Sequence, residues 1–189
     1  YEGIPVEDHI IAITGNLEHL RNAQTIEEMM GFEGSTRNMY YDSWNVILRN
    51  GITFEKRIKQ PPVGIVNSLL SFGNSMLYGA CISEIYRTRL NPFIGFLHEC
   101  GNKKHPLAYD ISEIFKPIVV DRVIFRCINL GILNENDFKH TEKGFYLKDN
   151  ARKKFVEEFE KRLSNVIHHK RLNRRISYRS LIRMECYNL

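Results

Sequence analysis

Hydrophobic side chains recur every three to four residues along most of the chain, which is the spacing of one face of an α-helix. This pattern predicts amphipathic helices over residues 7–21 and 25–50, the second region as one helix or two, and a long apolar helix over 66–88. The intervening segment 51–64 (GITFEKRIKQPPVG) contains two glycines and a Pro-Pro pair. Glycine and proline interrupt regular structure, so this segment is predicted to be a loop.

The same periodicity continues in the second half of the chain. Residues 107–130 form one helical pattern in which Pro117 predicts a kink or a break, because proline removes a backbone N–H. The buried stripe of this helix is expected to be Leu107, Ile111, Ile114, Phe115 and Ile118. Residues 134–146 favour a turn or a small hairpin, and helices are expected over 149–168 and 176–187. Few stretches show the two-residue alternation of a β-strand, so the predicted fold class is mainly α.

Composition adds limits on the class of protein. A chain of 189 residues that is 43% hydrophobic can bury the core of a globular domain. Its longest apolar stretches are interrupted by Asn67, Gly73, Asp121 and Arg126 before they reach about 18 residues, so no transmembrane segment is expected. Four widely spaced cysteines form no CxxC pair, which indicates packing roles and a reducing cytoplasm.

Positive charge is concentrated at the C-terminal end. Residues 148–189 hold twelve Lys or Arg against five Asp or Glu, a balance of +7, whereas the other 147 residues hold fifteen against seventeen. Within this end, segment 168–183 (HHKRLNRRISYRSLIR) places bases between single aromatic and aliphatic residues. Such a segment favours a polyanionic partner, because basic side chains release counterions from phosphates. The alternative is the solvated face of a soluble helix.

A candidate metal site lies near the middle of the sequence. Asp110 and Glu113 are three residues apart, so they share one face of the predicted helix and repel each other. A cation would relieve this repulsion, and two carboxylates with the imidazole of His98 suit Mn²⁺ or Mg²⁺. Alternatively, Asp110 caps the helix, Glu113 is solvated and His98 is a hydrogen-bonded core residue. A zinc site of His98, Cys100 and His105 lacks a fourth ligand.

Several segments together resemble the CRISPR-associated adaptation integrase, the catalytic subunit of spacer acquisition. They follow the order of that family and cover the chain from about Gly31 to the end. The segments are GFEGSTRNMYY, KRIKQPPVGIVNSLLSFGNSMLYGACISEIY, LNPFIGFLHE, LAYDISEIFKPIVVDRVIF and HHKRLNRRISYRSLIRMECYNL. The resemblance implies a division into a linker with the first helices over 1–30 and a helical metal-dependent catalytic domain over 31–189.

The resemblance also implies a set of site residues. By motif, the metal ligands are Glu33 in FEGSTR, His98 in GFLH and Glu113 in YDISE, with Asp110 close by. The family often has aspartate where Glu113 stands, which leaves open whether Asp110 or Glu113 is the closer ligand. Asp110 is alternatively a catalytic group that takes the proton from the attacking hydroxyl.

A polar stripe on the most apolar helix gains an explanation from the same resemblance. Asn67, Ser71, Asn74 and Tyr78 follow one helix face, and a buried polar group without a partner costs roughly 1–3 kcal/mol. These side chains therefore face the metal, its waters or a DNA phosphate, with Tyr78 near the scissile phosphate. For Asn67 and Ser71, a hydrogen-bonded seam between helices is the alternative.

The activity implied by the resemblance is divalent-metal-dependent cleavage and transfer of DNA phosphodiesters, which inserts new spacers into a CRISPR array. A DNA 3′-hydroxyl attacks the edge of a repeat, and water replaces it in hydrolysis. The expected DNA-binding residues are Arg37, Tyr78, Arg171, Arg174, Arg175 and Arg179. The alternative function is a non-catalytic nucleic-acid-binding helical domain that uses the basic C-terminal segment.

Partners follow from the resemblance as well. They are DNA, as spacer precursor and CRISPR repeat, and a small ferredoxin-like CRISPR-associated subunit. Family members also carry a β-rich N-terminal domain that forms homodimers, which is not expected in this chain. A module that only docks onto a partner subunit is a further alternative, and it is compatible with catalysis.

Overall fold

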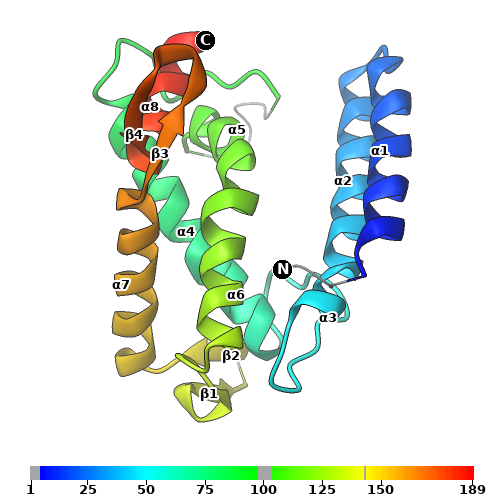
Figure 1. Ribbon diagram of the computed structural model, residues 1–189, viewed down its shortest axis with the longest axis vertical. Coiled ribbons are helices and arrows are strands. Elements are labelled where there is room, and N and C mark those ends of the chain that lie inside the picture. The colour runs from blue at the N-terminus through cyan, green and yellow to red at the C-terminus, as the bar shows by residue number, and fades with distance from the viewer. Residues whose placement is uncertain (1–4, 98–103, 143) are drawn as a thin grey trace.

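The computed structural model describes residues 5–97, 104–142 and 144–189, and these form a mainly α fold, as predicted. A hairpin of two helices stands beside a larger helical body (Figure 1). The helices are α1 (Glu7–Arg21), α2 (Ile26–Asp42), α3 (Trp44–Ile47), α4 (Gly64–Ile85), α5 (Pro106–Phe115), α6 (Asp121–Asn129), α7 (Asp149–Ser164) and α8 (Tyr178–Asn188). The strands are β1 (Phe138–Thr141), β2 (Gly144–Leu147), β3 (Val166–His169) and β4 (Arg174–Ser177).

The hairpin of α1 and α2 reaches the body through its C-terminal end. Thr25 caps α2 by accepting a hydrogen bond from the N–H of Glu28 at 3.1 Å. After α2, the short helix α3 places Trp44 against Phe125 of α6, with ring centroids 4.6 Å apart. The region 25–50 therefore forms two helices. The division predicted at residue 30 falls inside α2, and it remains a prediction.

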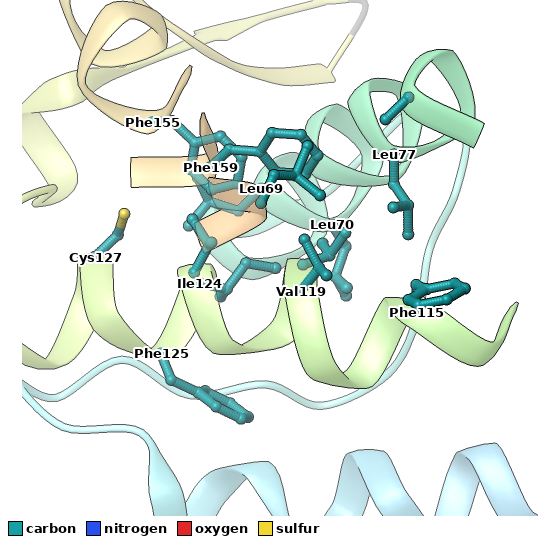
Figure 2. Packing of buried hydrophobic residues seen from close by; sticks show 14 of the residues in the cluster. Leu69, Leu70, Leu77, Phe115, Val119, Ile124, Phe125, Cys127, Phe155 and Phe159 are labelled. Carbon is teal, nitrogen blue, oxygen red and sulfur yellow. The ribbon is translucent and has the colours of Figure 1, made fainter. Parts of the chain in front are cut away.

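The body is built around α4, which contacts α5, α8 and α6. Leu69, Leu70 and Leu77 of α4 are fully buried, and Figure 2 shows Leu69 beside Phe155 and Phe159 of α7. By length and a mean hydropathy of 1.2, α4 is also long and apolar enough to cross a membrane. Half of its most apolar 18-residue stretch is buried inside the fold. The apolar character of α4 is therefore that of a core helix.

The pattern over 107–130 is divided into α5, a π-helical turn over Lys116–Val120, and α6, with the break at Pro117 as predicted. The predicted buried stripe is wrong at two positions, because Ile114 is 51% exposed and Ile118 is 36% exposed. The core-facing side of α5 is instead completed by Ala108 and Ser112, which are small and were not recognised as core residues. The two carboxylates of this helix differ in exposure, because Asp110 is 4% exposed and the side chain of Glu113 is 20% exposed.

Two β-hairpins complete the fold. The β1–β2 hairpin agrees with the turn or hairpin predicted over 134–146. The β3–β4 hairpin was not predicted: α7 ends at Ser164, and the basic segment then pairs as antiparallel strands, with Val166 opposite Ser177. Asn173 provides the turn with a positive φ of 45°, which asparagine tolerates. The C-terminal bases are therefore displayed on a hairpin.

The described cysteines are Cys81, Cys127 and Cys186, and each is a buried free thiol. This confirms their predicted packing role. Cys100 lies outside the described residues.

Candidate active site

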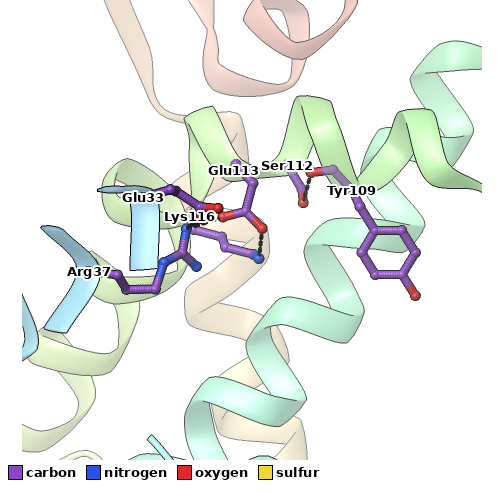
Figure 3. Close-up of polar contacts among 6 residues, drawn as sticks. All are labelled: Glu33, Arg37, Tyr109, Ser112, Glu113 and Lys116. Carbon is purple, nitrogen blue, oxygen red and sulfur yellow. Dashed lines mark hydrogen bonds and ion pairs between the residues drawn. The ribbon is translucent and has the colours of Figure 1, made fainter. Parts of the chain in front are cut away.

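Acidic and basic side chains from three elements meet where the α1–α2 hairpin faces the body. Glu33 and Arg37 lie one turn apart on α2, Glu113 lies on α5, and Lys116 opens the π-helical turn (Figure 3). Arg37 Nη2 donates to Glu33 Oε1 at 2.5 Å and also to Glu113 Oε2, and Lys116 Nζ donates to Glu113 Oε1. We call these four residues the carboxylate cluster. It brings together two carboxylates that are 80 positions apart in the sequence.

Electrostatics keep Glu113 ionised. Burial raises the pKa of this carboxyl, but the ammonium of Lys116 and the guanidinium of Arg37 outweigh burial and hold the pKa below its usual range. Burial likewise lowers the pKa of Lys116, which Glu113 opposes. The predicted alternative of a solvated Glu113 is wrong, since its side chain is 20% exposed and paired with two cations. An ionised carboxylate is the form that binds a metal ion.

The cluster opens into a polar cleft of about 720 Å³. The cleft is lined by the cluster and by Arg57, Ser71, Asn74, Tyr78 and Tyr109, among others. The rings of Tyr78 and Tyr109 lie 4.4 Å apart between centroids, and Lys116 Nζ lies 5.1 Å from the centre of the Tyr78 ring. Tyr78 thus lies beside the cluster.

Asn67, at the start of the predicted polar stripe, does not line the cleft. The side chain of Asn67 forms hydrogen bonds with the loop before α4. Its Oδ1 accepts from the N–H of Ile58 at 2.9 Å, and its Nδ2 donates to the carbonyls of Lys56 and Val63. Ser71 Oγ accepts from Arg57 at 3.0 Å. Both alternatives proposed for Asn67 are therefore wrong, since it faces a loop. No hydrogen-bond donor reaches Asn74 Oδ1 within the described residues.

Asp110 points toward a different partner from Glu113. Its Oδ2 accepts hydrogen bonds from the backbone N–H groups of Phe96 at 2.8 Å and Leu97 at 3.3 Å, and the residue is 4% exposed. The predicted alternative that Asp110 caps its own helix is wrong, because the N-cap of α5 is His105. Asp110 anchors the segment that leads directly to His98, which lies outside the described residues.

Replacing Asp110 by asparagine separates an anchor from a ligand or a base. Asparagine keeps an oxygen that accepts both N–H groups, so we expect D110N to retain, within roughly tenfold, the metal-dependent DNA cleavage that the family resemblance implies. Alanine removes the acceptor, and D110A should lose more activity than D110N. The measurement is the cleavage rate of both variants under identical metal and salt conditions. Complete loss of activity in D110N would instead identify Asp110 as a ligand or a base.

A buried carboxylic acid lies behind the cluster. Asp121 lines a mostly apolar cavity of about 380 Å³ between α1, α2 and the body, and Tyr40 Oη donates to its Oδ2 at 3.0 Å. Burial raises the pKa of Asp121 to about 7, although the hydrogen bond from Tyr40 opposes this. Asp121 was recognised from the sequence only as an interruption of an apolar stretch.

The raised pKa of Asp121 predicts a pH-dependent stability. Between about pH 4 and pH 7 the folded protein keeps this proton and the unfolded chain loses it, so this group's contribution to stability falls as pH rises. D121N removes the ionisation. We expect the free energy of unfolding of D121N minus that of the unchanged protein to be up to about 3 kcal/mol larger at pH 8 than at pH 5. Urea unfolding at both pH values measures it, and an equal difference at both would contradict the prediction.

The predicted DNA-binding arginines occupy three places. Three of them are exposed on the β3–β4 hairpin: Arg171 lies between the strands, and Arg174 and Arg175 lie on β4. This hairpin follows the C-terminal end of α7 (Figure 1). Arg179 on α8 pairs with Glu160 at 2.7 Å. Arg37 binds the two carboxylates of the cluster, so its partners in this structure are acids.

The donor set of the cluster fits a hard divalent ion. Two carboxylates converge from α2 and α5, and oxygen donors are the ligands that Mn²⁺ and Mg²⁺ prefer. Among residues 5–97, 104–142 and 144–189, no three His, Cys, Asp or Glu side chains lie close enough to hold a metal. The predicted third ligand, His98, is outside those ranges, and so is the Cys100 of the zinc alternative. The ligand set remains a prediction.

Sequence reasoning missed two basic residues at this site. Lys116 was read only as part of a helix, and Arg57 only as part of a loop. A lysine three residues after Glu113 is a recognisable helical ion-pair spacing. No local signal marks Arg57, because its contacts come from the fold of the loop onto α4.

Comparisons with known proteins agree on one family. The family model described as CRISPR associated protein Cas1 matches residues 4–161. A CRISPR-associated endonuclease Cas1 from Clostridium perfringens (strain SM101 / Type A) is 47% identical over 185 residues, which cover 96% of this chain and 56% of the relative. The chain therefore spans about half the length of the curated relatives it matches.

Solved structures agree with the sequence comparison. A Cas1 protein from Thermotoga maritima superposes with a TM-score of 0.86 at 38% identity, over 93% of this chain and 55% of that protein. A casposase bound to its integration product superposes with a TM-score of 0.82 at 28% identity, over 91% of this chain and 51% of the casposase.

Proposed function

The chain belongs to the CRISPR-associated Cas1 family, and from this premise we propose that it carries the active site of a metal-dependent DNA endonuclease and integrase. The observation that carries the proposal is the convergence of Glu33 and Glu113, from α2 and α5, at one polar cleft. The likeness to a casposase bound to an integration product supports strand transfer as the reaction. The product would be a new spacer inserted into a CRISPR array.

Glu33, Glu113 and His98 would hold Mn²⁺ or Mg²⁺, which when bound polarises a phosphate oxygen and neutralises developing charge. Arg37 pairs with both Glu33 and Glu113, and Lys116 pairs with Glu113, so the two carboxylates are held at one place before any ion arrives. This arrangement pre-organises the site, because the two acids need not approach each other against their repulsion. Asp110 holds the backbone of Phe96 and Leu97, directly before His98 in the sequence, and so has a positioning role.

The nucleic-acid contacts of the proposal extend beyond the cluster. Tyr78 lies in the cleft beside Lys116, in a position to contact the strand that reacts. Arg171, Arg174 and Arg175 on the basic hairpin and Arg179 on α8 would bind the phosphate backbone of the spacer precursor or repeat. Such contacts supply affinity more than sequence specificity.

Assembly is part of the same proposal. The longer family proteins would form homodimers and bind a small ferredoxin-like CRISPR-associated subunit, and they would act in the cytoplasm. Binding of that subunit to this chain without DNA tests the docking role separately from catalysis.

Replacing His98 by alanine tests the proposed function. We expect Mn²⁺-dependent cleavage or strand transfer to fall by about a hundredfold while DNA affinity stays within twofold, because two carboxylates still hold the ion weakly. Rates are compared with those of His140→Ala, in which an exposed histidine of β1 is removed. Unchanged activity in the His98 variant would remove this residue from the site.

The second candidate is a non-catalytic DNA-binding domain that uses the exposed arginines of the basic hairpin. It predicts that replacing Arg171, Arg174 and Arg175 together abolishes every DNA-dependent property, and that the unchanged protein has no metal-dependent cleavage. The proposed enzyme instead retains slow cleavage at high DNA concentration in this triple variant. Cleavage assays at several DNA concentrations distinguish the two.

A further inference from the structure

Arg57 is held in one orientation inside the polar cleft. It lies in the loop before α4, and its Nη1 donates to the carbonyl of Ile58 at 2.9 Å and to Oδ1 and the carbonyl of Asn67 at 3.0 and 3.2 Å. Its Nη2 donates to Ser71 Oγ at 3.0 Å. Asn67 is itself fixed by the loop, so the guanidinium is pre-organised by a network of hydrogen bonds.

The loop that carries Arg57 is also fastened from the other side. The N–H of Phe145 in β2 donates to the carbonyl of Pro62 at 2.9 Å. Gly144 lies against this loop, and a Cβ there would come within 2.9 Å of Pro61 Cβ. The loop is therefore held between α4 and β2, which fixes where Arg57 enters the cleft.

The charge of Arg57 is not neutralised within the described part of the chain. Its four acceptors are two carbonyls, an amide oxygen and a hydroxyl, and no carboxylate there forms an ion pair with it. The other two basic residues buried in the cleft are different, because Arg37 and Lys116 both pair with Glu113. Burial lowers the pKa of Arg57, and the neighbouring charge of Arg37 lowers it further.

A half-buried guanidinium with only neutral partners is costly, because desolvation of a charge is offset well only by an opposite charge. The Nε–H of Arg57 has no acceptor among residues 5–97, 104–142 and 144–189, so a donor remains for a ligand. The surrounding cleft is open, polar and about 720 Å³ in volume. An anion that enters the cleft would complete the coordination of Arg57.

We propose that Arg57 is a phosphate-binding residue that holds a backbone phosphate of a single DNA strand in the cleft, beside the carboxylate cluster. The inference rests on the proposed function and names the residue that positions the strand for it. Arginine suits this role because its planar fork matches phosphate oxygens. The Tyr78–Tyr109 pair in the same cleft offers aromatic surface for the adjoining base.

The test measures binding of a fluorescent single-stranded oligodeoxythymidine by anisotropy in EDTA, so that cleavage does not contribute. We expect R57Q to bind roughly 10- to 100-fold more weakly than the unchanged protein, as for loss of a hydrogen bond to a charged group. The slope of log affinity against log salt should also fall by about 0.7, the value for one phosphate contact on a single strand. R57K keeps the charge, so its slope should match that of the unchanged protein.

Arg152→Gln is the matched control, because Arg152 is exposed on α7 and pairs with Asp149. Its affinity should stay within twofold. Ser71→Ala removes one anchor of Arg57 and keeps the charge, so it should lose less than R57Q and leave the salt slope unchanged. If circular dichroism shows that R57Q is unfolded, the test uses R57K and Ser71→Ala. Both variants are then expected to bind the oligonucleotide at least threefold more weakly than the unchanged protein, with the same slope of log affinity against log salt.

The outcomes separate the two proposals. If the unchanged protein binds and cleaves DNA while a folded R57Q binds with the same affinity and salt slope, the role of Arg57 is excluded and the enzyme remains. If R57Q is unfolded, then unchanged DNA affinity in both R57K and Ser71→Ala also excludes the role of Arg57. If the unchanged protein binds no DNA, both proposals fall.

Discussion

Replacing Glu113 by glutamine is expected to lower the proposed metal-dependent DNA cleavage by at least about a thousandfold, which is the largest effect expected on activity. Glutamine has nearly the same size but no charge, so it removes a hard anionic ligand. It also removes the negative charge that Arg37 and Lys116 share, so these two cations lie near each other with less charge between them. Both effects weaken the attraction of the cluster for a divalent ion.

Two measurements check this expectation. Single-turnover cleavage gives the rate, and Mn²⁺ affinity from electron paramagnetic resonance reports ion binding without catalysis. Glu160→Gln is the control, because Glu160 is an exposed carboxylate on α7 that pairs with Arg179. The proposed ligand set is wrong if E113Q binds Mn²⁺ as tightly as the unchanged protein and cleaves DNA at the same rate.

Replacing Phe155 by alanine is expected to cost about 3–5 kcal/mol of the free energy of unfolding, the largest effect expected on stability. Phe155 is fully buried on α7, its ring centroid lies 5.6 Å from that of Phe72, and it packs where Gly73 lets α4 approach closely. Alanine leaves a cavity that these close-packed helices cannot fill without moving. Urea denaturation gives the change.

The neighbouring residue provides the control for Phe155. Val156 is 37% exposed, and we expect Val156→Ala to cost less than about 1 kcal/mol, because little apolar surface is lost. Equal shifts of the denaturation midpoint in the two variants would contradict the packing described for α7 and α4. A smaller slope against urea in the Phe155 variant would indicate a changed unfolded state.

Much of the helical layout was predictable because helix periodicity is a local property. The helix expected over 7–21 coincides with α1, and the long apolar helix corresponds to α4. The prediction was weaker where the pattern depended on distant contacts. Ile114 fits a helical stripe by spacing, yet it is exposed, because the neighbours of α5 select the face that carries Ala108 and Ser112.

The candidate site was predicted in its residue types, and its arrangement was not. Resemblance named Glu33 and Glu113, but no spacing placed them together, since 80 residues separate them. Asp110 and Glu113 look equivalent on a helix, and the structure gives them different partners, the backbone of Phe96 and Leu97 and the cations of the cluster. The β3–β4 hairpin was missed because its short paired strands carry charges that resemble a solvated helix.

By itself, the sequence determined a mainly helical chain, its loop before the longest helix, its basic C-terminal end and the acids capable of binding a hard ion. These follow from side-chain chemistry and from periodicity within a few residues. Only the tertiary structure decided that Arg37 joins Glu33 to Glu113, that Asp110 anchors a backbone and that Arg57 enters the cleft with its charge unpaired. Those properties depend on burial and on contacts between segments remote in sequence, and neither is encoded in local spacing.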